Sequence, residues 1–394
     1  MSNWPELESK YYMHTVDRVP LVLVRGEGAR VWDDSGRQYL DFVAGWAVNS
    51  LGHAHPAIAR AVAGQASTLI QTSNQFYTIP QIQLAELLVK NSCLDKVFFS
   101  NSGAEANEGA VKLARRYGQY HLAGAYEVIS TYGSFHGRTL AMVAATGQVK
   151  HQKPFLPLPT GFVNVAYDDP EAIQAVTSAR TCAVMLEPVQ GEGGVNLPGD
   201  DYLKKVRDWC DRKGILLILD EIQTGMGRLG TLFAYEQYGI VPDIMTLAKG
   251  LGGGVPIGAL MAKDKVCVFV PGEHGSTYGG NPLACAAAYA TLKYVLDHNL
   301  VSNAGKVGQY LLDGLEKLKQ KYEVVIDVRG RGLLVAIEFN QDIGASLLAA
   351  CLERGLLVNR VKPNALRLMP PLTIGNDEVD EALGILDKAL SSIA

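Results

Sequence analysis

An apolar run ends in a single lysine in the stretch Pro242-Asp243-Ile244-Met245-Thr246-Leu247-Ala248-Lys249-Gly250, and Leu251-Gly252-Gly253-Gly254 follows it directly. The apolar residues predict a short buried strand. The glycines allow the backbone to turn sharply and another group to come close. Lys249 is therefore either a solvated strand end or a desolvated amine held for chemistry. Burial lowers the pKa of a lysine and makes its amine a nucleophile toward a carbonyl.

A carboxylate ends a second apolar run upstream, Gly214-Ile215-Leu216-Leu217-Ile218-Leu219-Asp220-Glu221. An amine and a carboxylate, each at the end of its own buried strand, are the groups that a pyridoxal phosphate site needs. In such a site Lys249 forms the Schiff base, and Asp220 pairs with the pyridinium nitrogen and makes the ring an electron sink. The alternative for Asp220 is a strand-end carboxylate that caps a turn.

Length and composition limit the classes to which the protein can belong. A chain of 394 residues is long enough for two domains. Its 48% apolar and 19% charged residues are typical of a soluble globular protein. Its net charge of -4 does not indicate a binding surface for nucleic acid or an anionic membrane. The six cysteines form no CxxC pair, so we expect no metal site, no disulfide framework and a reducing, cytoplasmic setting. No stretch predicts a membrane span, and Met1–Lys10 lacks the apolar core of a signal peptide.

The order of elements predicts an α/β fold: a large domain at residues 76–296 and a smaller α+β domain formed by both chain ends, residues 1–75 and 297–394. In the large domain, strands alternate with helices and most strands are continuously apolar, as in a mostly parallel sheet covered on both faces. The first segment contains a hairpin at Arg30–Phe42 with its turn at Asp34-Ser35-Gly36. In the last segment, Arg329-Gly330-Arg331-Gly332 separates two expected strands. The seven strands expected in the large sheet are Lys96–Ser100, Glu127–Thr131, Phe162–Ala166, Cys182–Leu186, Ile215–Asp220, Ile244–Leu247 and Ile257–Met261.

The first of these strands is followed by a helix start that suits an anion. Ligands collect at the carboxyl ends of strands in an open α/β sheet. Ser102 and Glu105 form a capping box for the next helix. The backbone N–H groups of Gly103 and Ala104 at that helix start would hold a phosphate. The alternative is a well-capped helix and nothing more.

Other strand ends carry further candidate side chains. Phe135 could lie against a planar ring and Arg138 could clamp a carboxylate, or the two are a core aromatic and a surface arginine. Glu187 and Glu192 flank a glycine-rich turn, which suits a site that handles cations or arginines. Gln223 could reach the hydroxyl group of the ring.

Several rival sites find no support in the sequence. The glycines after Lys249 do not spell GxGxxG, which disfavours a dinucleotide loop, and GxxxxGK[ST] does not occur. His53 and His55 could suggest a metal, but with no third ligand nearby we interpret the pair as a turn and a helix cap. A regulator or binding module that borrowed this fold would lack the lysine or the aspartate, or carry an added DNA-binding region, and the chain has neither feature.

With these residues in place, the sequence resembles the class III (subgroup II) pyridoxal-phosphate-dependent aminotransferases of fold type I. The resemblance spans nearly the whole chain, from Val31-Trp32-Asp33 to Pro370-Pro371-Leu372. Two blocks, Phe135–Thr139 and His274–Ala284, are typical of the acetylornithine subfamily. The motifs that carry the resemblance to the class are Asn101–Asn107, Phe135–Thr139, Leu219–Gly225, Thr246–Gly250 and Gly275–Pro282.

The resemblance implies a role for each cofactor-binding residue. Lys249 is the Schiff-base lysine and proton shuttle, and Asp220 pairs with the ring nitrogen. Gln223 pairs with the ring oxygen, and Phe135 stacks on the ring. A homodimer with shared active sites is implied, because one phosphate contact comes from the neighbouring subunit. The phosphate contacts are Ser102, Gly103, Ala104 and, from that subunit, Thr277.

The resemblance also implies a ping-pong transfer of an ω-amino group from N-acetylornithine or a related ω-amino acid to 2-oxoglutarate. Arg138 and Ser276 bind a substrate carboxylate. Arg367 holds the α-carboxylate of glutamate, with Glu192 as its removable partner.

Trp46 departs from the pattern of the family, so the identity of the amino donor stays open. Trp46 stands where acetylornithine enzymes have a small aliphatic residue and ornithine enzymes a tyrosine, so it either narrows the side-chain pocket or fills space against a loop. Tyr77 is also expected to line this pocket. Ornithine, succinylornithine, 4-aminobutyrate, an acetyl-lysine-type donor or a simple amine remain alternative donors. Decarboxylation and aminomutation remain alternative reactions on the same cofactor.

Overall fold

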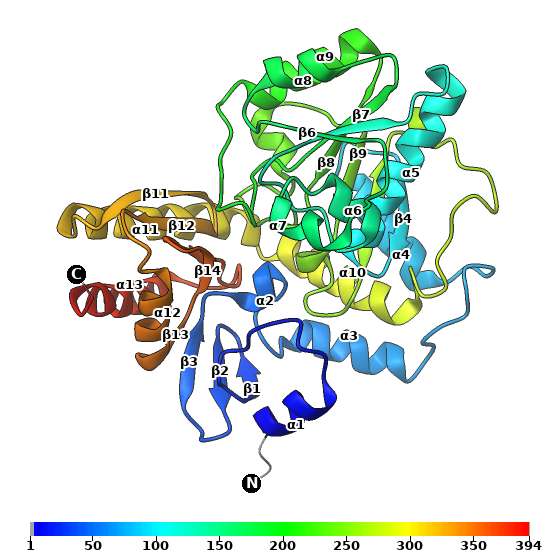
Figure 1. Cartoon of the computed structure of the whole chain (residues 1–394). Coiled ribbons are helices and arrows are strands. Elements are labelled where there is room, and N and C mark those ends of the chain that lie inside the picture. The colour runs from blue at the N-terminus through cyan, green and yellow to red at the C-terminus, as the bar shows by residue number, and fades with distance from the viewer. Residues whose placement is uncertain (1–3, 394) are drawn as a thin grey trace.

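The computed structural model describes residues 4–393 and is built around a seven-stranded sheet (Figure 1). The strands β9, β8, β7, β5 and β6 pair in parallel, whereas β10 runs antiparallel to both of its neighbours. The predicted mostly parallel seven-stranded sheet is thus confirmed. From edge to edge the strands are β4 (Lys96–Ser100), β10 (Gly258–Ala262), β9 (Ile244–Leu247), β8 (Leu216–Asp220), β7 (Thr181–Leu186), β5 (Glu127–Thr131) and β6 (Phe162–Val165).

Helices cover both faces of this sheet, which explains why its strands are continuously apolar. Every residue of β5, β7, β8, β9 and β10 is buried. On β8, Leu216 and Ile218 pack in the core that α5 (Gly103–His121) shares, whereas Leu217 and Leu219 pack in the core of α9 (Tyr202–Lys213). Alternate residues of one strand therefore serve opposite layers, as the two-residue period of a strand requires.

Two four-stranded sheets lie beside the large one and are built from both ends of the chain (Figure 1). In the first sheet, β13 pairs in parallel with β3, so residues from the two ends of the chain share one ladder. The hairpin predicted at Arg30–Phe42 is confirmed as β2 and β3. The division of the chain at residues 75 and 296 stays a prediction. In the first sheet the strand order is β1 (Leu23–Glu27), β2 (Arg30–Asp33), β3 (Gln38–Asp41) and β13 (Leu356–Leu357). In the second sheet the strand order is β11 (Val325–Arg331), β12 (Leu334–Phe339), β15 (Ala365–Leu368) and β14 (Asn359–Lys362).

The segment Arg329–Gly332, predicted as a separator between two strands, is instead largely strand. β11 continues to Arg331, and Gly330 pairs with Val335 of β12. Gly330 has φ +154°, and a Cβ there would lie 2.4 Å from the Leu334 carbonyl oxygen. Glycine is used here because the neighbouring strand comes too close for a side chain, not because the chain leaves the sheet.

The predicted cap is confirmed at His55, whereas His53 pairs with Gly28 in an isolated bridge. His55 caps α3 (Pro56–Ala66), because its Nδ1 accepts a hydrogen bond of 3.3 Å from the Ala57 backbone N–H, and Pro56 begins the helix. His53 Nε2 lies 2.7 Å from Asp41 Oδ2.

The remaining helices pack around the three sheets. Those outside the large sheet's core include the long α11 that precedes β11 and the final helix α13. The helices and short 3-10 turns are α1 (Trp4–Tyr11), α2 (Ala44–Ala47), α3 (Pro56–Ala66), α4 (Ile79–Lys90), α6 (Leu140–Ala145), α7 (Val149–Gln152), η1 (Lys153–Phe155), α8 (Pro170–Val176), η2 (Ala234–Tyr238), η3 (Lys249–Leu251), η4 (Asp264–Val266), α10 (Pro282–Asp297), α11 (Leu300–Lys321), α12 (Gly344–Glu353) and α13 (Asn376–Ser391).

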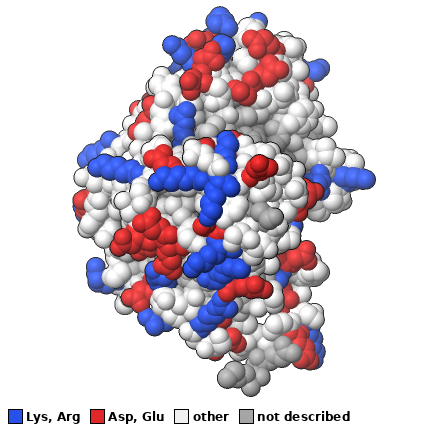
Figure 2. All heavy atoms as spheres, turned by 90° about the vertical axis from the view of Figure 1, so that its left-hand side faces the viewer, with Lys and Arg blue, Asp and Glu red and all other residues white. Residues whose placement is uncertain are grey.

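The face that carries α11, α12 and α13 bears charged side chains of both signs. Lys, Arg, Asp and Glu are interspersed on it (Figure 2). Several of them pair across elements, as Lys321 of α11 does with Asp387 of α13 at 2.7 Å. Within residues 4–393, no helix has both the length and the apolar character needed to cross a membrane.

A glycine on β10 sets the position of the α5 start. A Cβ at Gly258 would lie 2.3 Å from the Ser102 carbonyl oxygen and 2.6 Å from Ser100 Oγ. We expect Gly258→Ala to lower the free energy of unfolding by about 1–3 kcal/mol, as overpacking does, in a urea titration. Gly64→Ala is the matched control, because Gly64 is exposed on α3 and a Cβ there meets nothing within 4 Å. A Gly258→Ala protein as stable as the Gly64→Ala protein would contradict this packing.

Candidate active site

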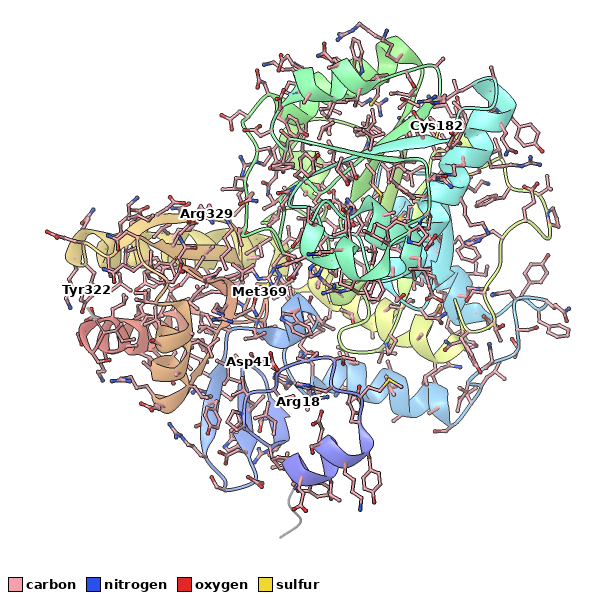
Figure 3. All side chains as sticks on the ribbon, in the orientation of Figure 1. Arg18, Asp41, Cys182, Tyr322, Arg329 and Met369 are labelled. Atoms are coloured by element: carbon pink, nitrogen blue, oxygen red, sulfur yellow. The ribbon has the colours of Figure 1, made fainter. Side chains whose placement is uncertain are left out.

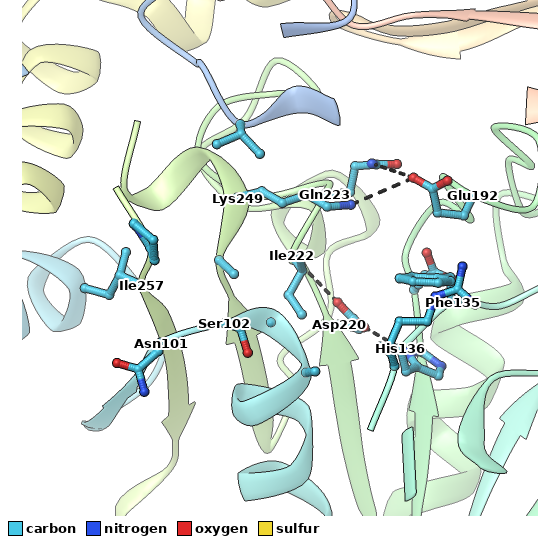
Figure 4. Close-up of a pocket in the computed structure, with 18 of the residues that line it drawn as sticks. Asn101, Ser102, Phe135, His136, Glu192, Asp220, Ile222, Gln223, Lys249 and Ile257 are labelled. Carbon is cyan, nitrogen blue, oxygen red and sulfur yellow. Dashed lines mark hydrogen bonds and ion pairs between the residues drawn. The ribbon is translucent and has the colours of Figure 1, made fainter. Parts of the chain in front are cut away.

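The residues that follow the parallel strands converge on a cavity of about 420 Å³ (Figure 4). Its walls come from the ends of β5, β7, β8 and β9, the start of α5, and the loop before β10. The cavity lies at the carboxyl edge of the sheet, where open α/β sheets bind their ligands. The lining residues that were predicted as site residues are Ser102, Gly103, Ala104, Phe135, Arg138, Glu192, Asp220, Gln223 and Lys249.

Asp220 is held at the floor of this cavity by donors from several segments. It is only 3% exposed. Its Oδ2 accepts hydrogen bonds from Asn107 Nδ2 at 2.7 Å and from His136 Nδ1 at 2.8 Å, and its Oδ1 accepts one from the Ile222 N–H at 3.1 Å. Thr246 Oγ1 in turn donates to Asn107 Oδ1 at 2.6 Å. Both oxygens of this buried carboxylate are hydrogen-bonded, which offsets the cost of removing them from water.

His136 and Asn107 are functional candidates to which the sequence alone assigned no role. Burial acts to lower the pKa of His136, but the hydrogen bond to Asp220 and the negative charges of Asp220 and Glu187 together outweigh burial, so the pKa is raised. Its Nε2 is buried and has no hydrogen-bond partner among the described residues. The only sequence signal for the two residues was their place inside the motifs Phe135–Thr139 and Asn101–Asn107. Their role depends on a contact between segments that are distant in sequence.

Lys249 follows β9 and points into the cavity. Its Nζ lies 4.0 Å from Glu192 Oε1, and its side chain is 21% exposed. Burial lowers the pKa of Lys249 below that of an ordinary lysine, although Glu192 acts in the opposite direction. Its backbone has φ +41°, in the left-handed region that residues other than glycine rarely adopt. Such strain is common at functional sites.

The start of α5 offers an anion site. Ser102 Oγ accepts a hydrogen bond from the Glu105 N–H at 3.3 Å and so caps the helix. The predicted capping box is modified, because Glu105 Oε2 accepts from the Asn101 N–H at 2.7 Å and not from the Ser102 N–H. The Gly103 and Ala104 N–H groups belong to the first turn of α5, where no carbonyl of the helix can accept from them.

Phe135 and Arg138 form one side of the cavity. The Phe135 N–H donates to Glu187 Oε2 at 2.9 Å, and the Arg138 guanidinium lies 5.1 Å from the centre of the Phe135 ring. Arg138 Nη1 lies 2.9 Å from His151 Nδ1. Burial and the neighbouring Arg138 lower the pKa of His151. A neutral His151 can therefore accept a hydrogen bond from Arg138, and the guanidinium keeps other donors for a ligand.

Glu192 and Arg367 form an ion pair at the opposite side. Arg367 is fully buried, and its Nη1 lies 2.9 Å from Glu192 Oε1 and 3.0 Å from Gln223 Oε1. Asn359 Oδ1 accepts from Arg367 Nη2 at 2.8 Å. Burial acts to raise the pKa of Glu192, but Arg367 and Lys249 outweigh it and hold the pKa at about 2. Glu192 is therefore a carboxylate at any neutral pH.

Glu187, which the sequence only associated with cations, has a structural contact in this site. Besides the Phe135 N–H, it accepts from the Gly191 N–H at 3.3 Å. Burial raises its pKa to about 7. It thus joins the loop that carries Phe135 to the loop that carries Glu192.

Four of the predicted residues do not line the cavity of their own chain. Trp46 is 51% exposed on α2, and Tyr77 is 97% exposed. Val48 lines the cavity instead of Trp46. Ser276 lies nearby, since its Oγ accepts from Asn101 Nδ2 at 3.2 Å, and the Thr277 carbonyl accepts from Gln71.

The residues present fit pyridoxal phosphate. Among residues 4–393, Asp220 Oδ1 accepts a single hydrogen bond, from a backbone N–H, so it can receive a second donor such as a ring N–H. Lys249, the Phe135 ring and the N-terminus of α5 lie in the walls of the same cavity, which has room for a planar ring and a phosphate. This is the donor set that the cofactor needs.

Comparisons with known proteins agree with this geometry. Residues 11–390 match the family model "Aminotransferase class-III". The acetylornithine aminotransferase of Caldanaerobacter subterraneus subsp. tengcongensis is 52% identical over 387 residues, which cover 98% of this chain and 98% of that protein. The acetylornithine aminotransferase of Methanocaldococcus jannaschii is 48% identical and covers 99% of this chain, with 98% of its own length matched.

Solved structures show the same likeness. The crystal structure of ornithine aminotransferase from Toxoplasma gondii ME49 matches with a TM-score of 0.96 and 35% identity, over 99% of this chain and 94% of that one. The acetylornithine aminotransferase from Elizabethkingia anophelis matches with a TM-score of 0.88 and 36% identity, over 99% and 98%. The chain therefore belongs to the class III aminotransferase family and is a pyridoxal-phosphate-dependent transaminase.

Proposed function

We propose that this transaminase moves the ω-amino group of N-acetylornithine, or of a related ω-amino acid, to 2-oxoglutarate and so yields a semialdehyde and glutamate. The observation that carries the proposal is the Glu192–Arg367 ion pair at 2.9 Å beside Lys249. A transaminase for these two substrates must hide a carboxylate-binding arginine from one and expose it to the other. Near-full-length identity of about 50% to proteins named acetylornithine aminotransferase supports the choice of donor.

Ornithine, 4-aminobutyrate and other ω-amines are the alternative donors. Ornithine is supported by the structural likeness to ornithine aminotransferases, at a lower identity of 35%. Trp46 is exposed in the single chain, so the shape of the donor pocket would depend on how a second subunit covers this segment.

The cofactor would be held by the residues that surround the cavity. Asp220 would keep the ring nitrogen protonated, Gln223 would contact the ring oxygen, and Phe135 would stack on the ring. The start of α5, from Ser102 to Ala104, would bind the phosphate. When bound, pyridoxal phosphate supplies an aldehyde that a primary amine attacks and a ring that withdraws electrons from the substrate carbon.

Lys249 would carry the proton in each half-reaction. Its lowered pKa favours the neutral amine, which can take a proton from the amine-bearing carbon of the donor. The same Nζ, once protonated, returns a proton. Glu192 lies close enough to stabilise the protonated form without a direct hydrogen bond.

Two arginines would orient the substrates. Arg138, with Ser276, would bind the carboxylate that lies far from the reacting carbon, and Arg367 would bind the α-carboxylate of glutamate after Glu192 moves aside. A guanidinium binds a carboxylate through two parallel hydrogen bonds and so fixes its orientation. Which carbon faces Lys249 depends on which arginine is free.

A homodimer with shared active sites would complete the site. Large apolar side chains are exposed near the residues assigned to the neighbouring subunit: Phe76 is 64% exposed, Tyr77 97% and Tyr278 64%. Asn74 Nδ2 donates to the Ser276 and Gly279 carbonyls, at 3.0 Å each, so these segments form one continuous surface. Exposed apolar patches of this kind mark protein interfaces. A second copy placed here would bring Thr277, Tyr77 and Trp46 to the partner's cavity.

A panel of amino donors tests the proposed reaction. Initial rates with 2-oxoglutarate as acceptor are measured for N-acetylornithine, ornithine and 4-aminobutyrate. We expect N-acetylornithine to have the highest kcat/KM, by at least about tenfold, which corresponds to about 1.4 kcal/mol of transition-state binding. A higher kcat/KM for ornithine would select the alternative donor. Release of carbon dioxide, or an isomerised product without 2-oxoglutarate, would indicate a different reaction.

Lys249→Ala should reduce kcat by about 10³-fold or more, because it removes the group that transfers the proton. The measurement is the steady-state rate with the best donor of the panel. Lys293→Ala is the control, since Lys293 is an exposed lysine of α10 paired only with Asp297. Appreciable turnover by the Lys249→Ala protein would contradict the assignment.

Arg138→Ala should raise KM for donors that carry a distal carboxylate by about 10- to 100-fold, the effect of losing roughly one charge-assisted hydrogen bond. Cofactor absorbance should be retained, because Arg138 is assigned to the substrate. A simple alkyl amine serves as the control donor, and its kcat/KM should be unchanged. Equal losses with both kinds of donor would show that Arg138 is not the carboxylate clamp.

A further inference from the structure

One rung of a small sheet carries two arginines toward the active-site loop. Arg329 of β11 pairs with Ala336 of β12, Ala336 pairs with Arg367 of β15, and Arg367 pairs with Asn359 of β14. Side chains directly opposite each other on antiparallel strands lie on the same face. Arg329 and Arg367 therefore face the same way, toward the loop that contains Glu192.

Arg329 joins the small sheet to the backbone of that loop. Its Nε donates to the carbonyl oxygens of Gly194 and Val195, at 3.1 Å each, and its Nη2 donates to Gly194 O at 2.7 Å. Two acids of its own sheet anchor it: Asp327 Oδ2 at 2.6 Å and Glu338 Oε2 at 2.7 Å. Figure 3 shows Arg329 where β11 meets the large part of the molecule. All three nitrogens of this one guanidinium thus make contacts, and together they join the small sheet to the loop.

The backbone that Arg329 holds is strained. Val195 is buried with φ +55°, a left-handed conformation that is unfavourable for a β-branched residue. The next residue, Asn196, is fixed by a backbone bridge to Gln190. Strained conformations persist only where the surroundings impose them. Here the carbonyl of the strained residue and the one before it are the two that Arg329 binds.

Resting on the two-substrate function proposed above, we propose that Arg329 is a positioning residue that determines how often Glu192 covers Arg367. Glu192 lies two residues before Gly194, and its Oε1 is 2.9 Å from Arg367 Nη1. Because Arg329 and Arg367 stand on one rung, the loop and the arginine that Glu192 must cover are held in fixed register. Only the Glu192 side chain then has to move when the carboxylate of the second substrate competes for Arg367.

Loss of the Arg329 guanidinium affects the two half-reactions differently. A relaxed loop leaves Arg367 uncovered for more of the time. In the first half-reaction the open Arg367 captures the α-carboxylate of the donor and turns the wrong carbon toward Lys249, so kcat/KM for the ω-amino donor falls. In the second half-reaction an open Arg367 is what 2-oxoglutarate requires, so its kcat/KM stays the same or rises.

The test compares the half-reactions of Arg329→Met, Arg329→Lys and Arg360→Met holoenzymes by stopped-flow absorbance of the cofactor. Arg360→Met is the matched control, because Arg360 is an exposed arginine of the same sheet on β14. We expect the ratio of donor to 2-oxoglutarate kcat/KM to fall about tenfold in Arg329→Met, as for loss of one charge-assisted hydrogen bond. Arg329→Lys, which keeps the charge but not the planar fork, should show the same shift at about threefold. Arg360→Met should show none.

A double-mutant cycle identifies the group through which Arg329 acts. In a Glu192→Gln background, Arg329→Met should add no further change in the ratio, because the ion pair that it controls is already gone. Hydrogen–deuterium exchange gives a readout apart from activity: residues 191–196 should exchange faster in Arg329→Met than in Arg360→Met. Equal losses in both half-reactions, a ratio change that persists in the Glu192→Gln background, or unchanged exchange would each overturn the proposal.

The identity of the amino donor and the role of Arg329 are tested by different measurements. If N-acetylornithine is not the donor, the wild-type protein reveals it in the donor panel. The Arg329 comparison is then made with the best ω-amino donor of that panel. The role of Arg329 is decided only by differences in the kcat/KM ratio between its variants and the control variant.

Discussion

A carboxylate that is withdrawn from water is the constraint on which the rest of this site depends. Asp220 must find its hydrogen bonds inside the protein, because an unpaired buried charge is very costly. Its donors come from α5, from the loop after β5 and from the turn after β8. Thr246, which donates to Asn107, lies three residues before Lys249 on the same strand and turn. The position of the lysine and the hydrogen bonds of the acid are therefore linked through one chain of side chains.

Two glutamates on one loop show how strongly the surroundings control charge. Glu187 has backbone donors but no direct partner cation, and its pKa is raised to about 7 by burial. Glu192, five residues later, faces Arg367 and Lys249 and has a pKa of about 2. Near neutral pH one residue changes its protonation state with the medium and the other does not. Only the second can serve as a permanent counter-charge for an arginine.

The sequence was sufficient where one segment determined the outcome. The strand that ends in Asp220 and the strand that ends in Lys249 were both predicted, because continuous apolar runs with polar ends carry that information locally. The roles of His136 and Asn107 were missed, because each depends on a contact across more than one element. The Arg329–Gly332 segment was misjudged for a related reason. Two glycines usually indicate a loop, but at Gly330 the requirement came from a neighbouring strand that the local sequence does not reveal.

Because β3 pairs in parallel with β13, the first small sheet can be completed only after residue 356 has been synthesised. Leu40 pairs with Leu356, which is synthesised roughly 15–60 s later at ordinary bacterial or eukaryotic rates. During that interval β3 has one free edge, and a free strand edge is a template for other chains. The nascent N-terminal hairpin thus exposes an unpaired strand edge until residue 356 has been made, and a chain that stops short of that residue keeps the edge unpaired.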